Sequence, residues 1–208
     1  EIKSLGGYIN AHTTLDSTSY EITVPSGFVK NALLILNDML FNSTLNEFEF
    51  EREKAVILKE IHFRDDDPGQ YLNRLTFESA YLNHPYKFPV IGYENLLRNL
   101  KRNDLAAYYS KRYISPNIIV AVSGDIDSGD VEGEILEIFG KAPRKISVSE
   151  PSFSDPPING VKTLSKIYET PLAHTVIAFK GVSINNPDMY ALDTLSMILG
   201  QGESSRLN

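Results

Sequence analysis

The chain has 208 residues, of which 42% are hydrophobic and 10% aromatic, enough for one large or two modest globular domains. Its formal net charge of -7, with no clustered Lys and Arg, argues against binding to nucleic acid or to an anionic membrane. It contains no cysteine, which excludes thiolate ligands and disulfides, and no apolar run long enough to span a membrane.

The first third of the chain predicts a hairpin followed by three helices. Residues 7–25 alternate in polarity around a polar turn, as in a β-hairpin. Residues 28–40 and 46–63 have apolar side chains at helical spacing. The run of aspartates before Pro68 ends the second helix, and Pro68 opens a third that continues through Tyr81.

The middle of the chain predicts two short helices, a strand and another helix. The helices cover residues 93–100 and 103–113, the second capped by Asn103 or Asp104. The apolar run 118–123 predicts a buried strand, and an amphipathic helix follows at 131–139. This order favours an α+β fold.

The last third predicts a linker and then a second pattern of strands and helix. Proline and serine are frequent from residue 141 to 160, which indicates an interdomain linker. Strands are predicted at 166–168 and 175–179, with a helix from Pro187 to Leu199. We therefore predict a first domain at 1–145, a linker at 146–160 and the beginning of a second, similar domain at 161–208.

Two glutamates on the second helix form a candidate metal site. Glu53 and Glu60 are seven residues apart, about two helical turns, so they project from one face. Two acids stacked on a partly buried helix repel each other unless a cation or several donors lie between them. The alternative is a pair of ordinary surface acids, neutralised by neighbouring Lys and Arg at helical spacing.

A series of short motifs resembles one peptidase family. The motifs cover nearly the whole chain, and in order they are Ser4–Gly7 with Asn10-Ala11-x-Thr13, Glu51-x-Glu53 with Glu60, His84-Pro85-Tyr86 with Gly92-Tyr93, Tyr113-x-x-Pro116-Asn117, Gly124-Asp125, and Gly200-x-Gly202-x-Ser204-Ser205-Arg206-Leu207. Together they resemble the M16 zinc metallopeptidases, the family of pitrilysin, insulinase and the mitochondrial processing peptidase. The resemblance implies a pitrilysin-like domain, with an antiparallel sheet covered by helices.

The resemblance also implies a zinc site to which this chain contributes in part. In the family, two histidines of an H-x-x-E-H motif and a downstream glutamate hold the zinc, and the glutamate of the motif is the general base. Glu60 resembles the downstream ligand, and Glu53 resembles a supporting acid beside the site. No H-x-x-E-H occurs in this sequence, so we expect the Zn²⁺ of the intact protein not to bind to this chain alone.

The first strand resembles the edge strand on which these peptidases hold an extended substrate. Asn10 and Ala11 would then offer backbone groups around the scissile bond, as in β-augmentation. The alternative is a plain edge strand without a role in binding.

Two functions from different classes follow from these motifs. The first is a part of a zinc metalloendopeptidase, inactive by itself, whose partners are a peptide or unfolded polypeptide substrate and a second M16 half or subunit. The second is a non-catalytic M16 homologue that acts as a partner or structural subunit. We expect a soluble protein of the bacterial cytoplasm or periplasm.

Overall fold

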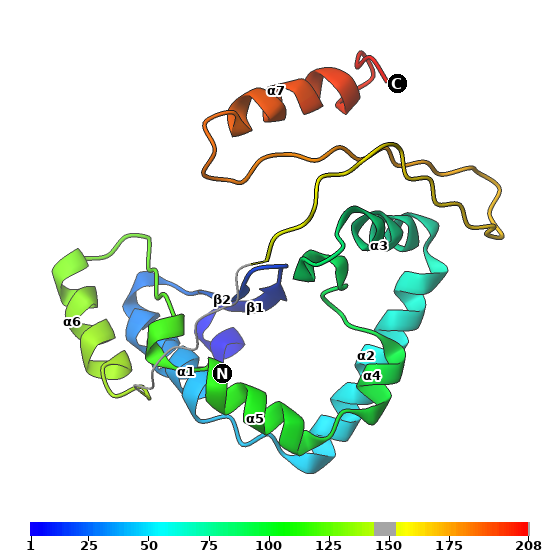
Figure 1. Cartoon of the computed structure of the whole chain (residues 1–208). Coiled ribbons are helices and arrows are strands. Elements are labelled where there is room, and N and C mark those ends of the chain that lie inside the picture. Colours follow the sequence, from blue (N-terminus) through cyan, green and yellow to red (C-terminus); the bar gives the residue numbers. More distant parts are fainter. Residues whose placement is uncertain (144–152, 208) are drawn as a thin grey trace. The chain divides into compact units, whose positions relative to one another are not determined.

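The computed structural model describes residues 1–143 and 153–207, which form two compact units (Figure 1). The first unit comprises Glu1–Asp66 and Phe88–Phe153, and the second comprises Asp67–Lys87 and Ser154–Asn208. The elements of the first unit are η1 (Ile2–Leu5), β1 (Tyr8–Thr13), β2 (Thr18–Thr23), η2 (Ser26–Phe28), α1 (Val29–Phe41), α2 (Glu47–Asp66), α4 (Glu94–Asn99), α5 (Arg102–Arg112), η4 (Ser115–Asn117) and α6 (Ser128–Phe139). Those of the second unit are α3 (Pro68–Ala80), η3 (Pro85–Lys87) and α7 (Met189–Gly200).

The predicted hairpin is confirmed. Strands β1 and β2 pair antiparallel, with Ala11 opposite Tyr20, and they form the one sheet found in the described residues. The backbone N–H of Thr14 donates to the carbonyl oxygen of Ser17 at 2.8 Å and closes the turn. This bond also shows which backbone groups of β1 point toward β2 and which point to the opposite edge of the strand.

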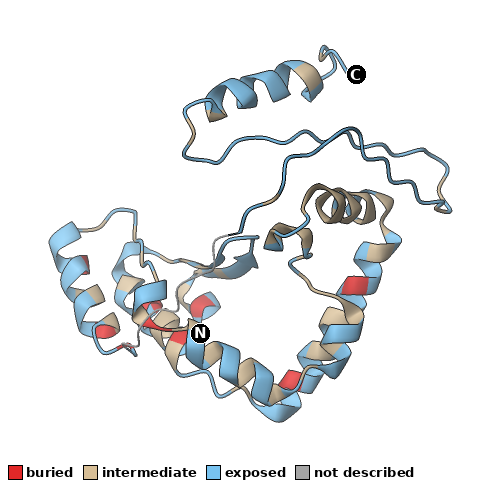
Figure 2. Ribbon diagram, viewed as in Figure 1, coloured by how far each residue is buried: buried red, intermediate tan, exposed pale blue. Residues whose placement is uncertain are grey.

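The core of the first unit lies where α1 and α6 pack together. Leu33 of α1 is 3% exposed and Ile138 of α6 is 8% exposed. The rings of Phe41 and Phe139 meet edge to face, with centroids 6.3 Å apart. In Figure 2, buried positions are red and occur on helices of the first unit, whereas α7 of the second unit is almost entirely exposed.

The boundary between α2 and α3 follows the prediction closely. Helix α2 continues to Asp66, three residues beyond the predicted end, and α3 begins at Pro68. Asp67 caps α3 because its carboxylate accepts a hydrogen bond from the N–H of Gln70 at 2.8 Å. The chain therefore passes from one helix to the next within a single non-helical residue.

The two short helices are confirmed, although the cap of the second differs from the prediction. Helix α5 has Lys101 at its N-cap position rather than Asn103 or Asp104. Asp104 acts from inside the first turn, where its carboxylate accepts the backbone N–H of Lys101 at 3.0 Å. An acid at this position also suits the positive end of the helix dipole.

The three later strand predictions are wrong for this structure. Residues 118–123, 166–168 and 175–179 carry no strand pairing, and Ile119 and Ile167 are 95% and 98% exposed. An apolar run or an alternating pattern indicates only that a segment would suit a sheet. A strand also needs a neighbour for its N–H and C=O groups, and the described residues place none beside these segments.

The elements form an α+β fold, as predicted, with helices and a small antiparallel sheet. The domain boundaries at 145 and 160 stay a prediction, because residues 146–152 of the predicted linker lie outside the described residues.

Candidate functional site

Helix α2 carries both candidate acids on one face. At 100° per residue, Glu53 and Glu60 lie within about 20° of each other and about 10.5 Å apart along the axis. Phe50 and Ile61, which are 9% and 3% exposed, form the buried stripe of the helix beside that face. Both glutamates are exposed. Their separation means that one cation bound directly by Glu60 would not also be bound directly by a Glu53 held on the same rigid helix.

The two glutamates differ in their neighbours. The side chain of Glu53 is 59% exposed, and its Oε1 lies 3.3 Å from Nη2 of Arg52, which also pairs with Glu49. Within the described part of the chain, no hydrogen bond or ion pair engages the carboxylate of Glu60. Glu60 is thus the acid that is available to a ligand, and Glu53 is partly neutralised by its own helix.

The residues present do not form a complete zinc site. A catalytic zinc takes three protein ligands, usually histidines and a carboxylate. Among the described residues, no group of three or more His, Asp or Glu side chains is placed to hold a metal ion. Glu60 can therefore supply one oxygen ligand, and the remaining ligands have to come from other residues.

The two histidines of the first unit, His12 and His62, interact with residues other than Glu60. Nδ1 of His12 lies 3.6 Å from Oε1 of Glu21, its neighbour across the hairpin. Nε2 of His62 lies 3.0 Å from Oε2 of Glu94 on α4. Two positions along a helix differ by about 200°, so the side of α2 that bears His62 is nearly opposite Glu60.

Helix α4 and its C-cap make two hydrogen bonds to α2, on the side of α2 that faces away from Glu60. The ammonium of Lys54 donates to the carbonyl oxygen of Leu100, the C-cap of α4, at 2.9 Å. At the other end of α4, hydrogen bonds from Arg98 and then from His62 lower the pKa of Glu94 below its ordinary value. Packing of α2 against α4 therefore leaves the face with the two glutamates uncovered by α4. The sequence alone did not indicate the contact of Lys54 with α4, because its partner is a backbone carbonyl group, which every residue has.

Among the described residues, one edge of strand β1 is paired with no other strand. In an antiparallel pair, hydrogen-bonded and non-hydrogen-bonded residue pairs alternate. Since Thr14 bonds to Ser17 across the turn, the pairs Asn10–Glu21 and Ala11–Tyr20 are hydrogen-bonded and non-hydrogen-bonded, respectively. The N–H and C=O of Ala11 consequently point away from β2, toward the free edge. Those of Asn10 point toward β2, so the backbone of Asn10 is not available at this edge, and only its exposed side chain, on a face of the hairpin, is left to contact a ligand.

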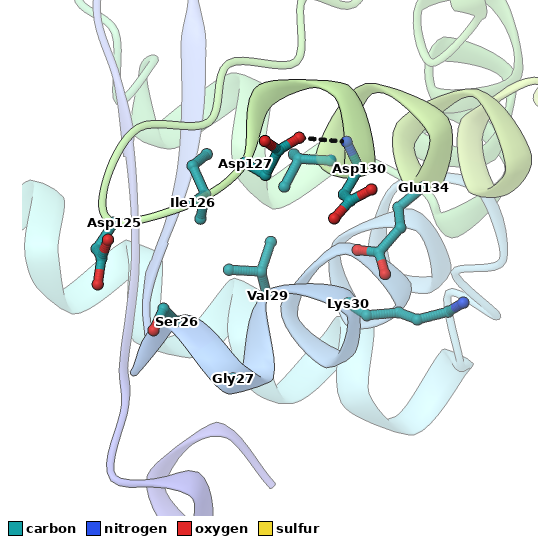
Figure 3. A pocket seen from close by; sticks show the side chains of 10 residues that line it. Ser26, Gly27, Val29, Lys30, Asp125, Ile126, Asp127, Asp130 and Glu134 are labelled. Atoms are coloured by element: carbon teal, nitrogen blue, oxygen red, sulfur yellow. Dashed lines mark hydrogen bonds between the residues drawn. The ribbon is translucent and has the colours of Figure 1, made fainter.

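A shallow pocket of about 350 Å³ opens elsewhere in the first unit, between the start of α1 and the start of α6 (Figure 3). Its lining includes the acidic side chains of Asp125, Asp127, Asp130 and Glu134. Asp127 is the N-cap of α6, and its carboxylate accepts the N–H groups of Gly129 and Asp130, at 2.9 and 3.1 Å. Capping of α6 accounts for this aspartate.

Two family models together match nearly the whole chain. Residues 1–94 match the family described as insulinase (peptidase family M16), and residues 99–208 match the one described as the peptidase M16 inactive domain. The chain belongs to peptidase family M16. The order of motifs along the sequence is thereby confirmed as an M16 pattern.

Individual M16 relatives agree with this assignment. The uncharacterized zinc protease YmxG of Bacillus subtilis (strain 168) is 30% identical over 206 residues, covering 98% of this chain and 49% of the relative. The mitochondrial-processing peptidase subunit beta of Blastocladiella emersonii is 28% identical over 200 residues, covering 96% of this chain and 43% of that protein. This M16 chain thus spans about half the length of the curated relatives it matches.

A solved structure confirms the fold. The crystal structure of a protease from Helicobacter pylori matches 99% of this M16 chain and 50% of its own, with a TM-score of 0.84 and 28% sequence identity. The fold is therefore pitrilysin-like, as the resemblance implied. No helix in the described part of this M16 chain is long and apolar enough to cross a bilayer.

Proposed function

We propose that this chain is part of a zinc-dependent M16 metalloendopeptidase that hydrolyses peptides held as an added strand on β1. The free edge at Ala11 carries the proposal, because a substrate backbone can pair there without disturbing the hairpin. The exposed, unengaged carboxylate of Glu60 supports it, since a metal ligand has to be free of other partners. Relatives named as zinc proteases support it further.

In this proposal, different residues of the chain would bind the substrate and the metal. The N–H and C=O of Ala11 would bond the backbone of an extended peptide and align it along β1. The side chain of Asn10 would contact the substrate from a face of the hairpin. Glu60 would supply one carboxylate ligand to Zn²⁺, which when bound lowers the pKa of water and polarises a carbonyl group. Glu53 would act as a supporting acid about two turns away on the same face.

The chain by itself should not hydrolyse peptides, because its sequence contains neither the two histidines nor the general base of the family motif. Zinc titration of the isolated chain by calorimetry checks this. Tight binding of one zinc per chain would contradict it.

Replacement of Glu60 in the intact protein tests the ligand role. Glu60→Gln keeps the size of the side chain but removes its charge, so we expect bound zinc to be lost and kcat/KM to fall more than about 100-fold. The matched control is Glu47→Gln, an exposed acid in the first turn of the same helix, which should leave both unchanged. Full zinc content and activity in Glu60→Gln would show that Glu60 is not a ligand.

Replacement of Glu53 separates the two acids. We expect Glu53→Gln to retain zinc while kcat falls about 10- to 100-fold, because the residue supports the site without holding the metal. Equal loss of zinc in both variants would contradict this division of roles.

A non-catalytic M16 partner subunit is the second candidate function. It is favoured by the match of residues 99–208 to the inactive domain and by a relative that is named as a subunit. In either case we propose that the chain works beside a second M16 half or subunit, in the bacterial cytoplasm or periplasm. Zinc content of the intact protein discriminates the two: an intact protein free of zinc and activity, which activates a second M16 protein on mixing, would establish the partner role.

A further inference from the structure

The loop that follows α3 binds a carboxylate from a distant part of the chain. Oδ1 of Asp155 accepts the backbone N–H groups of Leu82 and Asn83, at 2.7 and 2.6 Å. Its Oδ2 accepts the N–H of His84 at 3.2 Å. Three consecutive N–H groups thus converge on one side chain that is more than seventy residues away in the sequence.

This arrangement is a specific binding geometry rather than a chance surface contact. Successive backbone N–H groups that point to one side form a concave site for an anion, and bonds to a carboxylate are about twice as strong as neutral ones. The site follows the C-terminal end of α3, and the C-terminal end of a helix disfavours negative charge. Asp155 lies just beyond the end of α3, so the dipole of that helix opposes the contact and the three N–H groups have to offset it.

The protonation state of Asp155 agrees with a bound carboxylate. The hydrogen bond from Asn83, with those from Leu82 and His84, holds the pKa of Asp155 below its ordinary value despite partial burial. The side chain is therefore ionised at neutral pH. The amide of Asn83 adds a further bond to the neighbouring residue, donating from Nδ2 to the carbonyl oxygen of Ser154 at 3.2 Å.

Beyond Asp155 the same segment follows α3 back toward its first turn. The ammonium of Lys162 donates to the carbonyl oxygen of Ser79 at 3.3 Å. Further on, the ring of Tyr168 lies 5.9 Å from that of Tyr71, and Lys166 lies over the same ring. The contacts are met in reverse order along α3, so residues 154–168 run antiparallel to this helix.

We propose that the Leu82–His84 loop is a carboxylate-binding site and that Asp155 is its resident occupant, a latch that holds residues 154–168 along α3. Asp155 is the first strong contact of this segment, and the longer-range contacts of Lys162 and Tyr168 follow it. Release of the carboxylate would free three N–H groups at once. The vacant loop would then accept another carboxylate of the same size, such as acetate or the C-terminal carboxylate of a peptide.

Hydrogen exchange in the intact protein tests the latch. We expect Asp155→Ala to speed amide exchange about tenfold or more in a peptide containing Leu82 and Asn83, and to speed it also in residues 154–168. Asp188→Asn is the matched control, an exposed acid in the second unit whose side chain makes no cap to α7. Unchanged exchange at Leu82 and Asn83 in Asp155→Ala would overturn the proposal.

Acetate provides a test of the site itself. In Asp155→Ala, sodium acetate should restore protection of Leu82 and Asn83, whereas sodium chloride at equal ionic strength should not. Acetate should have no effect on the wild-type protein, in which Asp155 already occupies the loop. Equal effects of the two salts would contradict a carboxylate site.

If Asp155→Ala fails to fold, Asp155→Asn is the alternative variant. It keeps one acceptor oxygen, and loss of the charge alone should still accelerate amide exchange several-fold.

Discussion

The hydroxyl oxygens of Tyr20 and Tyr113 lie 2.6 Å apart, although the two residues are separated by 93 positions in the sequence. Their hydrogen bond joins β2 to the end of α5, so it ties the hairpin with the free edge to the helical part of the first unit. Tyr109 extends the link, because its ring is tilted against that of Tyr113, with centroids 4.9 Å apart, and its hydroxyl donates to the carbonyl oxygen of Leu40 at 2.8 Å.

Tyr113→Phe should therefore destabilise the protein by about 1 kcal/mol, since it keeps the ring contacts but leaves the half-buried hydroxyl of Tyr20 without this partner. Urea unfolding followed by circular dichroism measures the change. Tyr8→Phe, at a tyrosine that is 61% exposed, should have no effect. Equal stabilities of the two variants would show that the bond contributes nothing.

The same tyrosine should make stability fall at alkaline pH. Burial, together with the hydrogen bond to Tyr20, raises the pKa of Tyr113 well above its ordinary value. Above about pH 10 the unfolded chain loses the proton while the folded chain retains it, so the free energy of unfolding decreases as pH rises. Unfolding at a series of pH values should show a smaller decrease in Tyr113→Phe than in the wild type. Parallel curves would contradict the assignment.

Ala11→Pro should impair substrate binding without unfolding the hairpin. The N–H of Ala11 points to the free edge, so proline removes no bond to β2. We expect KM for an extended peptide to rise about three- to tenfold in the intact protein, because one backbone hydrogen bond to substrate is lost. Ala11→Val keeps the N–H and should bind peptide normally. An unchanged KM in Ala11→Pro would remove β1 from the substrate site.

Lys54→Met should loosen α4 from α2. The side chain of Lys54 is 14% exposed and donates to the carbonyl oxygen of Leu100, so its loss leaves that acceptor without the bond. We expect a stability loss of about 1–2 kcal/mol and faster amide exchange in α4. Lys59→Met, at an exposed position of the same helix, should change neither. A similar result for both lysines would mean that the contact with α4 is dispensable.

Gly7→Ala should disturb the start of β1. A Cβ at residue 7 would lie 2.6 Å from the carbonyl oxygen of Thr23 and 2.7 Å from Cγ1 of Val24. Relief of these contacts requires movement of the backbone, which should cost about 1–3 kcal/mol. At Gly27 a Cβ would meet nothing within 4 Å, and Gly27→Ala should leave stability within about 1 kcal/mol of the wild type. Thermal unfolding of the two variants makes the comparison.

The local pattern of the sequence determined most helices and the hairpin. The apolar spacing of α1, α2 and α6 and the proline at the start of α3 act within a few residues of the chain, so they are readable without a structure. The same periodicity placed Glu53 and Glu60 on one face of α2. The order of motifs led to the M16 family, which the family models confirmed.

Tertiary structure alone decided what depends on distant partners. The segment 118–123 has the composition of a strand, yet a strand forms only where a second backbone accepts its hydrogen bonds. The free edge at Ala11 depends on the pairing of β1 with β2. The hydrogen bond from Lys54 to the end of α4 depends on a carbonyl group 46 residues away. The binding site of Asp155 likewise could not be predicted from the sequence. Three backbone N–H groups form it, and every residue except proline has such a group.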